Sequence, residues 1–367
     1  MARSGLADEL VSTLTNPLDE RAVQRQWISG LLGEHPSSYS RSPALWNAAY
    51  RELRLDATYA AFDVPPDKLA AFVHGLRLSP RILGINVTVP YKQALLPFLD
   101  DLDPIARAIG ATNCVVRTPD GRLIGSNTDA TGALACLIRD RPGAEPFFPG
   151  LSAATVLLVG TGGAGRAVAS ALLSQLGEDG RLVLANRTRS TAEDVAHAVA
   201  PTGGQVEVIS EAELLAVAPR ADLVVNASTR GQAGFFHRQD GLITCLEPYT
   251  PLGPASPAWI DPRTATEESA QRRAWYLASL EDVRANERAA ADVLERMRPA
   301  ASFFDLVYAP AESTFLRTAR WSGHPTLNGS DMILHQAVAG FLIIARPLLS
   351  KAPADVEARV ERAMRSA

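Results

Sequence analysis

The chain has 367 residues, of which 47% are hydrophobic and 21% are charged, and its formal net charge is −4. This length allows two domains with cores of their own, and the mild acidity argues against binding to nucleic acid or to an anionic membrane. The three cysteines lack the spacing of a disulfide framework or a metal site, and the first residues lack the apolar run of a signal peptide. We therefore expect a cytoplasmic protein without a metal, a nucleic-acid partner or a membrane partner.

Strand-like and helix-like segments alternate along the first part of the chain, which predicts an α/β fold. Two short β-branched runs joined across Pro119-Asp120-Gly121 predict a hairpin over residues 114–125. The elements expected before it are a strand over 27–32, a helix over 43–53, a strand over 58–64, a helix over 65–76 and a strand over 82–89.

The composition changes near residue 150. Residues 154–160 form a continuous apolar run, as expected of a strand buried on both faces, and an alanine-rich helix follows. Further strands are expected over 181–186, 205–210 and 222–228. This pattern predicts a doubly wound nucleotide-binding domain that begins near residue 130 and is distinct from the first unit.

The alternation breaks between Asn226 and Asp305. Residues 245–262 contain five prolines and are expected to form an irregular loop. Residues 264–298 are rich in alanine, glutamate and arginine, which predicts a long charged helix or two such helices.

The segment from Gly160 to Gly165 fits the pattern G-x-G-x-x-G between the apolar strand and the helix. In a dinucleotide site, these glycines allow a tight turn, the approach of a pyrophosphate and close packing of the helix on the strand. The phosphates then lie at the positive end of the helix. The alternative is a glycine-rich turn with a structural role only, but the flanking strand and helix favour the dinucleotide site.

The end of the next strand indicates which dinucleotide is bound. NAD-binding folds usually place a carboxylate there for the ribose 2′-hydroxyl, whereas this strand ends in Asn186, Arg187 and Thr188, with Arg189 after them. A guanidinium group can clamp a 2′-phosphate. The alternative is a solvated basic turn; we favour NADP.

Two serines, Ser40 and Ser42, follow the first strand. Ser42 is expected to be the N-cap, and Pro43 the first residue, of the helix over 43–53. Capping explains Ser42 but not Ser40. Two hydroxyl groups beside the positive end of a helix also form a neutral cradle for a small carboxylate.

Lys92 lies just after a strand on which Asn86 and Thr88 point to one face. Asn113 and Asp129 lie at the ends of later segments, and such polar groups suit a polyhydroxylated ligand. Lys92 and Asp129 are the titratable pair in this set. The alternative for Lys92 is a solvated surface charge, as for most lysines.

Together these motifs resemble the shikimate dehydrogenase family. They occur in the family's order over residues 29–350, and the set is far more specific than any member of it. The motifs are SRSP (40–43), NVTVPYK (86–92), GATN (110–113), NTD (127–129), GTGGAG (160–165), NRT (186–188), NAS (226–228), DLVY (305–308) and NGSDMILHQ (328–336).

The resemblance implies two domains, a substrate domain over 27–129 completed by helices over 330–367, and a Rossmann-type NADP domain over 130–329. It implies Lys92 and Asp129 as the catalytic pair. The substrate residues that it implies are Ser40 and Ser42 for a carboxylate, and Asn86, Thr88, Asn113 and Gln336 for ring hydroxyls, with Tyr308 nearby. The cofactor residues that it implies are Gly160, Thr161, Gly162, Gly163, Ala164, Asn186, Arg187, Thr188, Ala227, Leu306, Gly329 and Met332.

The activity implied is the reversible NADP-dependent reduction of 3-dehydroshikimate to shikimate, in the chorismate pathway to the aromatic amino acids, by a monomer or homodimer. The alternatives are a quinate or aminoshikimate dehydrogenase and a catalytically silent NADP-binding paralogue.

Residues 1–26 and the insertion over 240–300 exceed what typical members need, and Ser330-Asp331 replaces a frequent Leu-Gly pair. We expect the helical part of the insertion to pack at the edge of the cofactor cleft or in a subunit contact. The alternative is a surface excursion without a role.

Overall fold

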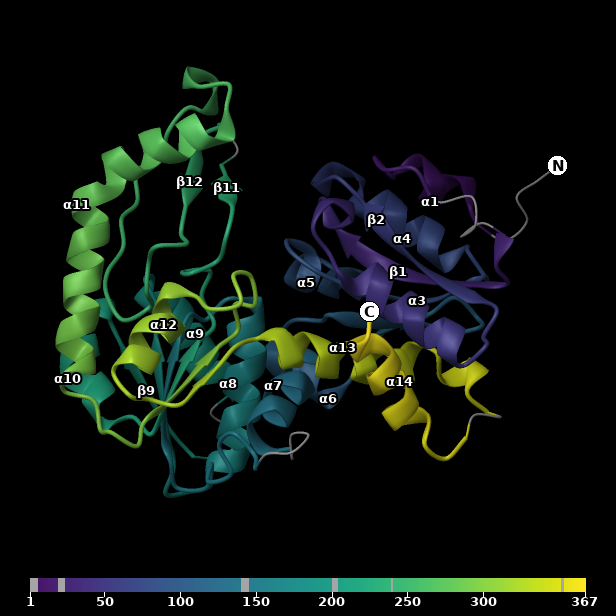
Figure 1. Cartoon of the computed structure of the whole chain (residues 1–367). Helices are drawn as coiled ribbons and strands as arrows, with labels where there is room; N and C mark the ends of the chain where they lie inside the picture. Colours follow the sequence, from purple (N-terminus) through teal and green to yellow (C-terminus); the bar gives the residue numbers. More distant parts are fainter. Residues whose placement is uncertain (1–5, 19–23, 140–144, 200–203, 239, 351–352) are drawn as a thin grey trace. The chain divides into compact units, whose positions relative to one another are not determined.

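The structure is a computed structural model of the whole chain (Figure 1), and it describes all residues except 1–5, 19–23, 140–144, 200–203, 239 and 351–352. The chain forms two compact units. The first comprises Met1–Cys136 and Met332–Ala367, and the second comprises Leu137–Asp331. No helix in the described part of the chain is long and apolar enough to cross a membrane.

The described residues of the first unit contain a six-stranded mixed sheet in the order β2-β1-β3-β5-β6-β4. β1 pairs in parallel with β2 and β3, whereas β5 is antiparallel to both β3 and β6. The strands are β1 (Trp27–Gly33), β2 (Ala57–Asp63), β3 (Ile82–Val87), β4 (Asp101–Leu102), β5 (Cys114–Arg117) and β6 (Leu123–Ser126). The antiparallel pairs arise from the predicted hairpin over 114–125, which is confirmed.

Two apolar clusters cover this sheet. One contains Trp46, Tyr50 and Phe341 and joins α3 to the C-terminal helices; the other contains Leu10 and Phe72 and joins α1 to α4. The helices are α1 (Asp8–Ser12), α3 (Ser42–Glu52), α4 (Leu69–Arg77), α5 (Tyr91–Ala94), α6 (Pro104–Ile109), α7 (Asp129–Ile138, which continues past the unit boundary), α13 (Ser330–Ile344) and α14 (Val356–Arg365). Leu10 is fully buried, so part of the N-terminal extension belongs to the core of this unit.

The second unit contains a six-stranded parallel sheet in the order β14-β13-β10-β7-β8-β9. This is the doubly wound order that the glycine cluster and alternating elements predict, and the Rossmann-type fold is confirmed. The strands are β7 (Thr155–Val159), β8 (Arg181–Ala185), β9 (Gln205–Ile209), β10 (Leu223–Asn226), β13 (Ser302–Asp305) and β14 (Thr326–Leu327). The helices around it are α8 (Gly163–Leu176), α9 (Arg189–Val199), α10 (Leu214–Val217) and α12 (Thr314–Trp321).

The insertion forms a short hairpin, a loop and one long helix. The hairpin consists of β11 (Phe235–His237) and β12 (Ile243–Cys245), and the helix is α11 (Glu268–Leu294). Figure 1 shows α11 running from the hairpin to α10. One end of α11 packs with Cys245 and Tyr249 in a small cluster, and its other end joins the main core of the unit through Ala290, Val293 and Leu294. The predicted long helix is confirmed.

Candidate active site

Polar side chains of the first unit gather at one edge of its sheet. β1 and β3 are parallel neighbours, and Ser40 and Ser42 follow β1 while Thr88 follows β3. Asn113 precedes β5, which is antiparallel to β3, and Asp129 follows β6, which is antiparallel to β5. All five residues therefore lie toward the carboxyl ends of β1 and β3, where ligand clefts of open α/β sheets form.

Lys92 and Asp129 form an ion pair at this edge. Lys92 Nζ donates to Asp129 Oδ2 at 2.6 Å, and the side chains are 19% and 7% exposed. Lys92 belongs to the short helix α5 after Pro90, and Asp129 is the first residue of α7. Lys92 is therefore not a fully solvated surface charge, and enough of its side chain is exposed for a ligand to reach it.

Asn113 orients the carboxylate of this pair. Its Nδ2 donates to the second carboxylate oxygen, Asp129 Oδ1, at 2.8 Å and to Gln336 Oε1 at 3.3 Å. Its Oδ1 accepts a hydrogen bond from the Thr128 amide at 2.7 Å. Because both ends of the Asn113 amide are engaged, the carboxylate is held with one oxygen toward the lysine.

Asn86 is 7% exposed and its side-chain amide is also oriented. Its Oδ1 accepts from the Tyr59 hydroxyl at 2.9 Å, and its Nδ2 donates to the Asn113 carbonyl at 3.2 Å. Burial raises the pKa of Tyr59 well above 10, so this hydroxyl remains a donor. A Cβ at Gly340 of α13 would lie 3.1 Å from Asn86 Nδ2, so the helix approaches the amide closely.

The expected capping role of Ser42 is wrong. α3 begins at Ser42 itself, and the preceding residue, Arg41, has helical dihedral angles without a side-chain cap. Instead, Ser40 Oγ accepts a hydrogen bond from the Ser42 amide at 3.1 Å. The turn before the helix brings the earlier serine back onto the helix end, which explains Ser40 and leaves both hydroxyl protons available to a ligand.

Four other residues that the sequence predicts, Leu306, Tyr308, Gly329 and Met332, lie outside this polar cluster. Tyr308 and Leu306 follow β13 in the second unit, whereas Met332 belongs to the first. A Cβ at Gly329 would lie 2.2 Å from the Leu306 carbonyl oxygen, so Leu306 and Gly329 are close neighbours beyond β13 and β14.

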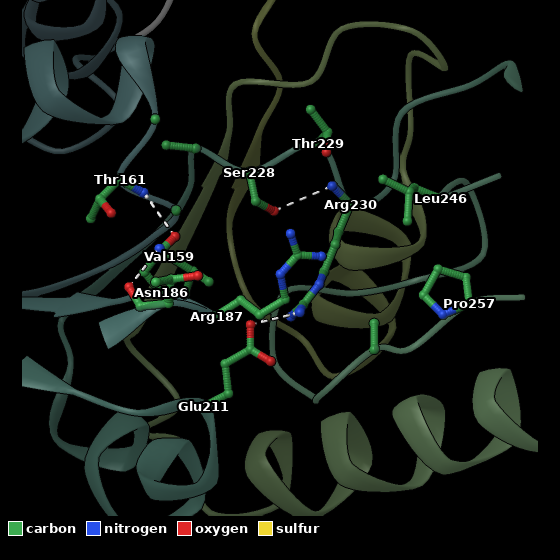
Figure 2. Close-up of a pocket in the computed structure, with 15 residues that line it drawn as sticks. Val159, Thr161, Asn186, Arg187, Glu211, Ser228, Thr229, Arg230, Leu246 and Pro257 are labelled. Carbon is green, nitrogen blue, oxygen red and sulfur yellow. Dashed lines mark hydrogen bonds and ion pairs between the residues drawn. The ribbon is translucent and has the colours of Figure 1, made fainter. Parts of the chain in front are cut away.

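The second unit contains a cavity of about 290 Å³ at the carboxyl ends of its parallel strands (Figure 2). Seven predicted cofactor residues line it: Gly160, Thr161, Gly162, Asn186, Arg187, Thr188 and Ala227. Gly163 and Ala164 are not among its lining residues; they form the first turn of α8.

The glycine loop fits the phosphates of a dinucleotide. Gly160 has φ +99°, and a Cβ on it would lie 2.6 Å from the Ser228 amide, so only glycine is accommodated there. A Cβ on Gly162, at the start of α8, would meet nothing within 4 Å, which leaves room above the helix end. Thr161 Oγ1 is the buried side-chain polar atom without a hydrogen-bond partner in the described part of the chain, as expected of a group that awaits a ligand.

The two arginines after β8 differ in their partners. Arg189 pairs with Glu193 at 2.9 Å and with Glu213 at 3.5 Å. Arg187 is exposed and lines the cavity, and it makes no hydrogen bond or ion pair with the residues that the structure describes. Arg187 is therefore the guanidinium group that is available to an anionic ligand.

Two charged residues of this cavity, Glu211 and Arg230, are not among the residues that the sequence predicts. They follow β9 and β10, so their place at the carboxyl ends of two parallel strands of this sheet was a usable signal. Six uncharged lining residues were not predicted either; they come from the ends of β7 and β10 and from the insertion: Val159, Ser228, Thr229, Leu246, Ala255 and Pro257.

A buried carboxylate, that of Asp305, supports one wall of the cavity. It accepts hydrogen bonds from Asn226 Nδ2 at 2.9 Å, from the Val307 amide at 2.9 Å and from the Ser313 hydroxyl. Asn226 Oδ1 in turn accepts from the amide and the hydroxyl of Ser228. The wall formed by Ser228 thus depends on a network that is anchored in the core.

Burial raises the pKa of Asp305 from 3.8 to about 7, although its three donors oppose the rise. Asp305 therefore holds a proton more tightly in the folded state than in the unfolded state. Its contribution to the free energy of unfolding falls as pH rises from about 4 to about 7. The loss is roughly 4 kcal/mol at most, at 1.36 kcal/mol per pKa unit. We expect the difference in melting temperature between wild type and Asp305→Asn to shrink over this range in calorimetry. A difference that is constant with pH would contradict the assignment.

The chain matches two protein-family models. Residues 31–115 match the shikimate dehydrogenase substrate binding domain, and residues 143–245 match shikimate / quinate 5-dehydrogenase. A shikimate dehydrogenase (NADP(+)) from Symbiobacterium thermophilum is 35% identical over 321 residues, which cover 86% of this chain and 87% of that protein.

Solved structures show the same similarity. The Thermus thermophilus shikimate 5-dehydrogenase in complex with NADP(H) and shikimate superposes with a TM-score of 0.62 at 27% identity, covering 93% of this chain and 99% of that one. The Corynebacterium glutamicum quinate dehydrogenase in complex with NAD superposes with a TM-score of 0.65 at 26% identity, covering 93% and 99% of the two chains.

Proposed function

The chain belongs to the shikimate dehydrogenase family, and from this premise we propose that it catalyses the reversible NADP-dependent reduction of 3-dehydroshikimate to shikimate. The observation that carries the proposal is the partly exposed Lys92–Asp129 ion pair at the carboxyl edge of the sheet. A catalytically silent paralogue has no use for this pair, whereas a dehydrogenase requires a proton donor beside the carbonyl oxygen.

We assign the substrate to the domain over 27–129 that is completed by residues 330–367, and the cofactor to the domain over 130–329. The oriented polar cluster supports the first assignment, and the glycine loop with its cavity supports the second. Three buried cysteines without a disulfide are consistent with a cytoplasmic enzyme. We place the reaction in the chorismate pathway and expect a monomer or homodimer.

NADPH supplies, when bound, the hydride for the carbonyl carbon of the substrate. As that carbon gains the hydride, the carbonyl oxygen gains negative charge, which the ammonium group of Lys92 stabilises. Lys92 then gives a proton from Nζ to this oxygen, so one N–H bond breaks and the product hydroxyl forms. In the oxidative direction neutral Lys92 accepts the proton.

The other residues of the cluster hold the substrate. Asp129 orients the ammonium group and accepts a hydrogen bond from a neighbouring ring hydroxyl. Asn86, Thr88, Asn113 and Gln336 bind the ring hydroxyls, with Tyr308 near the ring, and Ser40 and Ser42 bind the carboxylate. The hydrogen bond between the two serine residues supports this pairing, because it places both at the start of α3.

The cofactor residues follow the glycine loop and the strand ends. Arg187 binds the 2′-phosphate, since its guanidinium group has no partner in the described part of the chain. The remaining assignments are Gly160, Thr161, Gly162, Gly163, Ala164, Asn186, Thr188, Ala227, Leu306, Gly329 and Met332.

Shikimate is expected to exceed quinate in kcat/KM with NADP by at least about tenfold, or roughly 1.4 kcal/mol. Quinate carries an additional hydroxyl on the carbon that bears its carboxylate, and the pocket of Ser40 and Ser42 must discriminate at that carbon. Hydrogen-bonding neighbours can accept such a hydroxyl, so some quinate activity remains. Ser42→Thr is expected to lower the ratio of kcat/KM for shikimate to kcat/KM for quinate, because it weakens the binding of shikimate. The measurement is the initial rate of NADPH formation with each acid at one NADP concentration.

The same assay separates the alternatives. A higher rate with quinate, as the similarity to a quinate dehydrogenase allows, would make the protein a quinate dehydrogenase. Activity with an amino analogue alone would make it an aminoshikimate dehydrogenase. NADP binding without turnover of any of these acids would support the silent paralogue.

A further inference from the structure

The carboxylate of Glu211 lies in the nucleotide cavity and is held by Arg230 (Figure 2). Arg230 Nη2 donates to Glu211 Oε1 at 2.6 Å, and the side chains are 9% and 14% exposed. A phosphate monoester carries about −1.5 to −2 charges at neutral pH, so an unpaired carboxylate here would repel a 2′-phosphate. Unlike the carboxylate with which many such folds accept the 2′-hydroxyl of NAD, at the end of the strand after the glycine loop, Glu211 follows the next strand, β9.

Arg230 is fixed by the insertion as well as by Glu211. Its Nη1 donates to the Gly253 carbonyl at 2.8 Å. The same carbonyl accepts from Nδ2 of Asn286, a fully buried residue of α11, at 2.9 Å. Asn286 also accepts from the Thr250 amide, so α11 holds the loop that holds the arginine. The loop continues through Ala255 and Pro257, which line the cavity themselves.

We propose that Arg230 is a second determinant of cofactor choice, which masks Glu211 so that the cavity accepts a 2′-phosphate, and that the insertion exists in part to position it. The charged residues lining the cavity are Arg187, Arg230 and Glu211. With Arg230 present, the carboxylate is paired and Arg187 remains for the phosphate. Without Arg230, the unpaired carboxylate of Glu211 repels the phosphate that Arg187 attracts. This inference rests on the proposed function only in taking NADP as the cofactor.

The test is nucleotide binding by calorimetry, without substrate, on the full chain. In Arg230→Met the dissociation constant for NADP⁺ is expected to rise by about tenfold or more, because a like charge nearby in a partly buried site costs on the order of 1–2 kcal/mol. Binding of NAD⁺ is expected to change by less than about threefold, or to strengthen slightly. Equal weakening of both nucleotides would overturn the proposal, because it would show a general loss of the pocket.

The double variant Glu211→Gln, Arg230→Met separates masking from direct contact. Since the carboxylate is gone, we expect NADP⁺ affinity to return to within about threefold of wild type, a free-energy difference below roughly 0.7 kcal/mol. Failure to recover would overturn the masking role. If Arg230→Met does not fold, Glu211→Gln alone decides: NADP⁺ should bind more tightly, with a steeper salt dependence and NAD⁺ unchanged, and no change would overturn the proposal.

Arg320→Met is the matched control, because Arg320 pairs with Glu312 at 2.6 Å on the exposed surface of the same unit and does not line the cavity. It should leave both dissociation constants unchanged. These results are independent of turnover. A protein that shows the selective shift but oxidises no acid would refute the proposed function alone, and an active enzyme without the shift would refute this inference alone.

Discussion

Lys92→Ala is expected to lower kcat by on the order of a hundredfold or more, because a positioned general acid contributes about that much to a proton transfer. Shikimate should still bind, since its carboxylate and most of its hydroxyls are assigned to other side chains. Initial rates with shikimate and NADP measure kcat, and a binding titration with shikimate shows whether the pocket persists. Near-normal turnover would remove Lys92 from the mechanism.

Two variants sharpen this experiment. Lys68→Ala removes an exposed lysine of the same unit and should leave kcat and KM unchanged. Asp129→Asn keeps the shape of the side chain but removes its charge, so the ammonium of Lys92 loses its ionic partner at 2.6 Å. It should slow turnover and raise KM more than Lys92→Ala does, because the carboxylate is assigned a contact with a substrate hydroxyl.

Arg187→Ala is expected to raise KM for NADP by roughly ten- to a hundredfold, because a charge-assisted hydrogen bond to a phosphate contributes about 1.5–3 kcal/mol. KM for NAD should hardly change, since NAD has no 2′-phosphate. The measurement is the KM for each cofactor at saturating shikimate. A wild-type enzyme that prefers NAD would contradict this assignment at once.

Arg189→Ala is the control for this position. Arg189 lies two residues further on and is occupied by Glu193 and Glu213. Arg189→Ala should therefore change KM for NADP and KM for NAD by the same factor. An equal, selective effect of both substitutions on NADP would instead assign the phosphate to the basic segment as a whole.

Much of the secondary structure could be predicted because its causes are local. The apolar run that became β7 is buried in the centre of a parallel sheet, and Pro119-Asp120-Gly121 forms the turn between β5 and β6 as its residue types require. The glycine pattern likewise depends on backbone geometry at each position, as the positive φ of Gly160 shows.

The exact start of α3 was less predictable. Serine before proline is a good N-cap by composition, yet the helix includes Ser42, and Ser40 accepts from its amide. In both arrangements a serine hydroxyl accepts a hydrogen bond from a backbone amide of the first helical turn, so residue types alone do not separate them. The path of the preceding turn, in which the Ser40 amide donates to the Pro36 carbonyl at 3.0 Å, separates them in the folded chain.

The order of the elements, the two-unit α/β fold and the glycine loop are thus readable from the amino-acid sequence, because periodicity, turn chemistry and backbone freedom act over a few residues. The same holds for the residue types at the strand ends. Which polar groups meet depends instead on the packing of the whole chain. Lys92 reaches Asp129 across 37 residues, and Arg230 reaches both Glu211 and the Gly253 carbonyl. Such pairs form because the packing of the sheet and of α11 fixes where each chain segment lies. A short stretch of sequence does not show which distant segment packs against it.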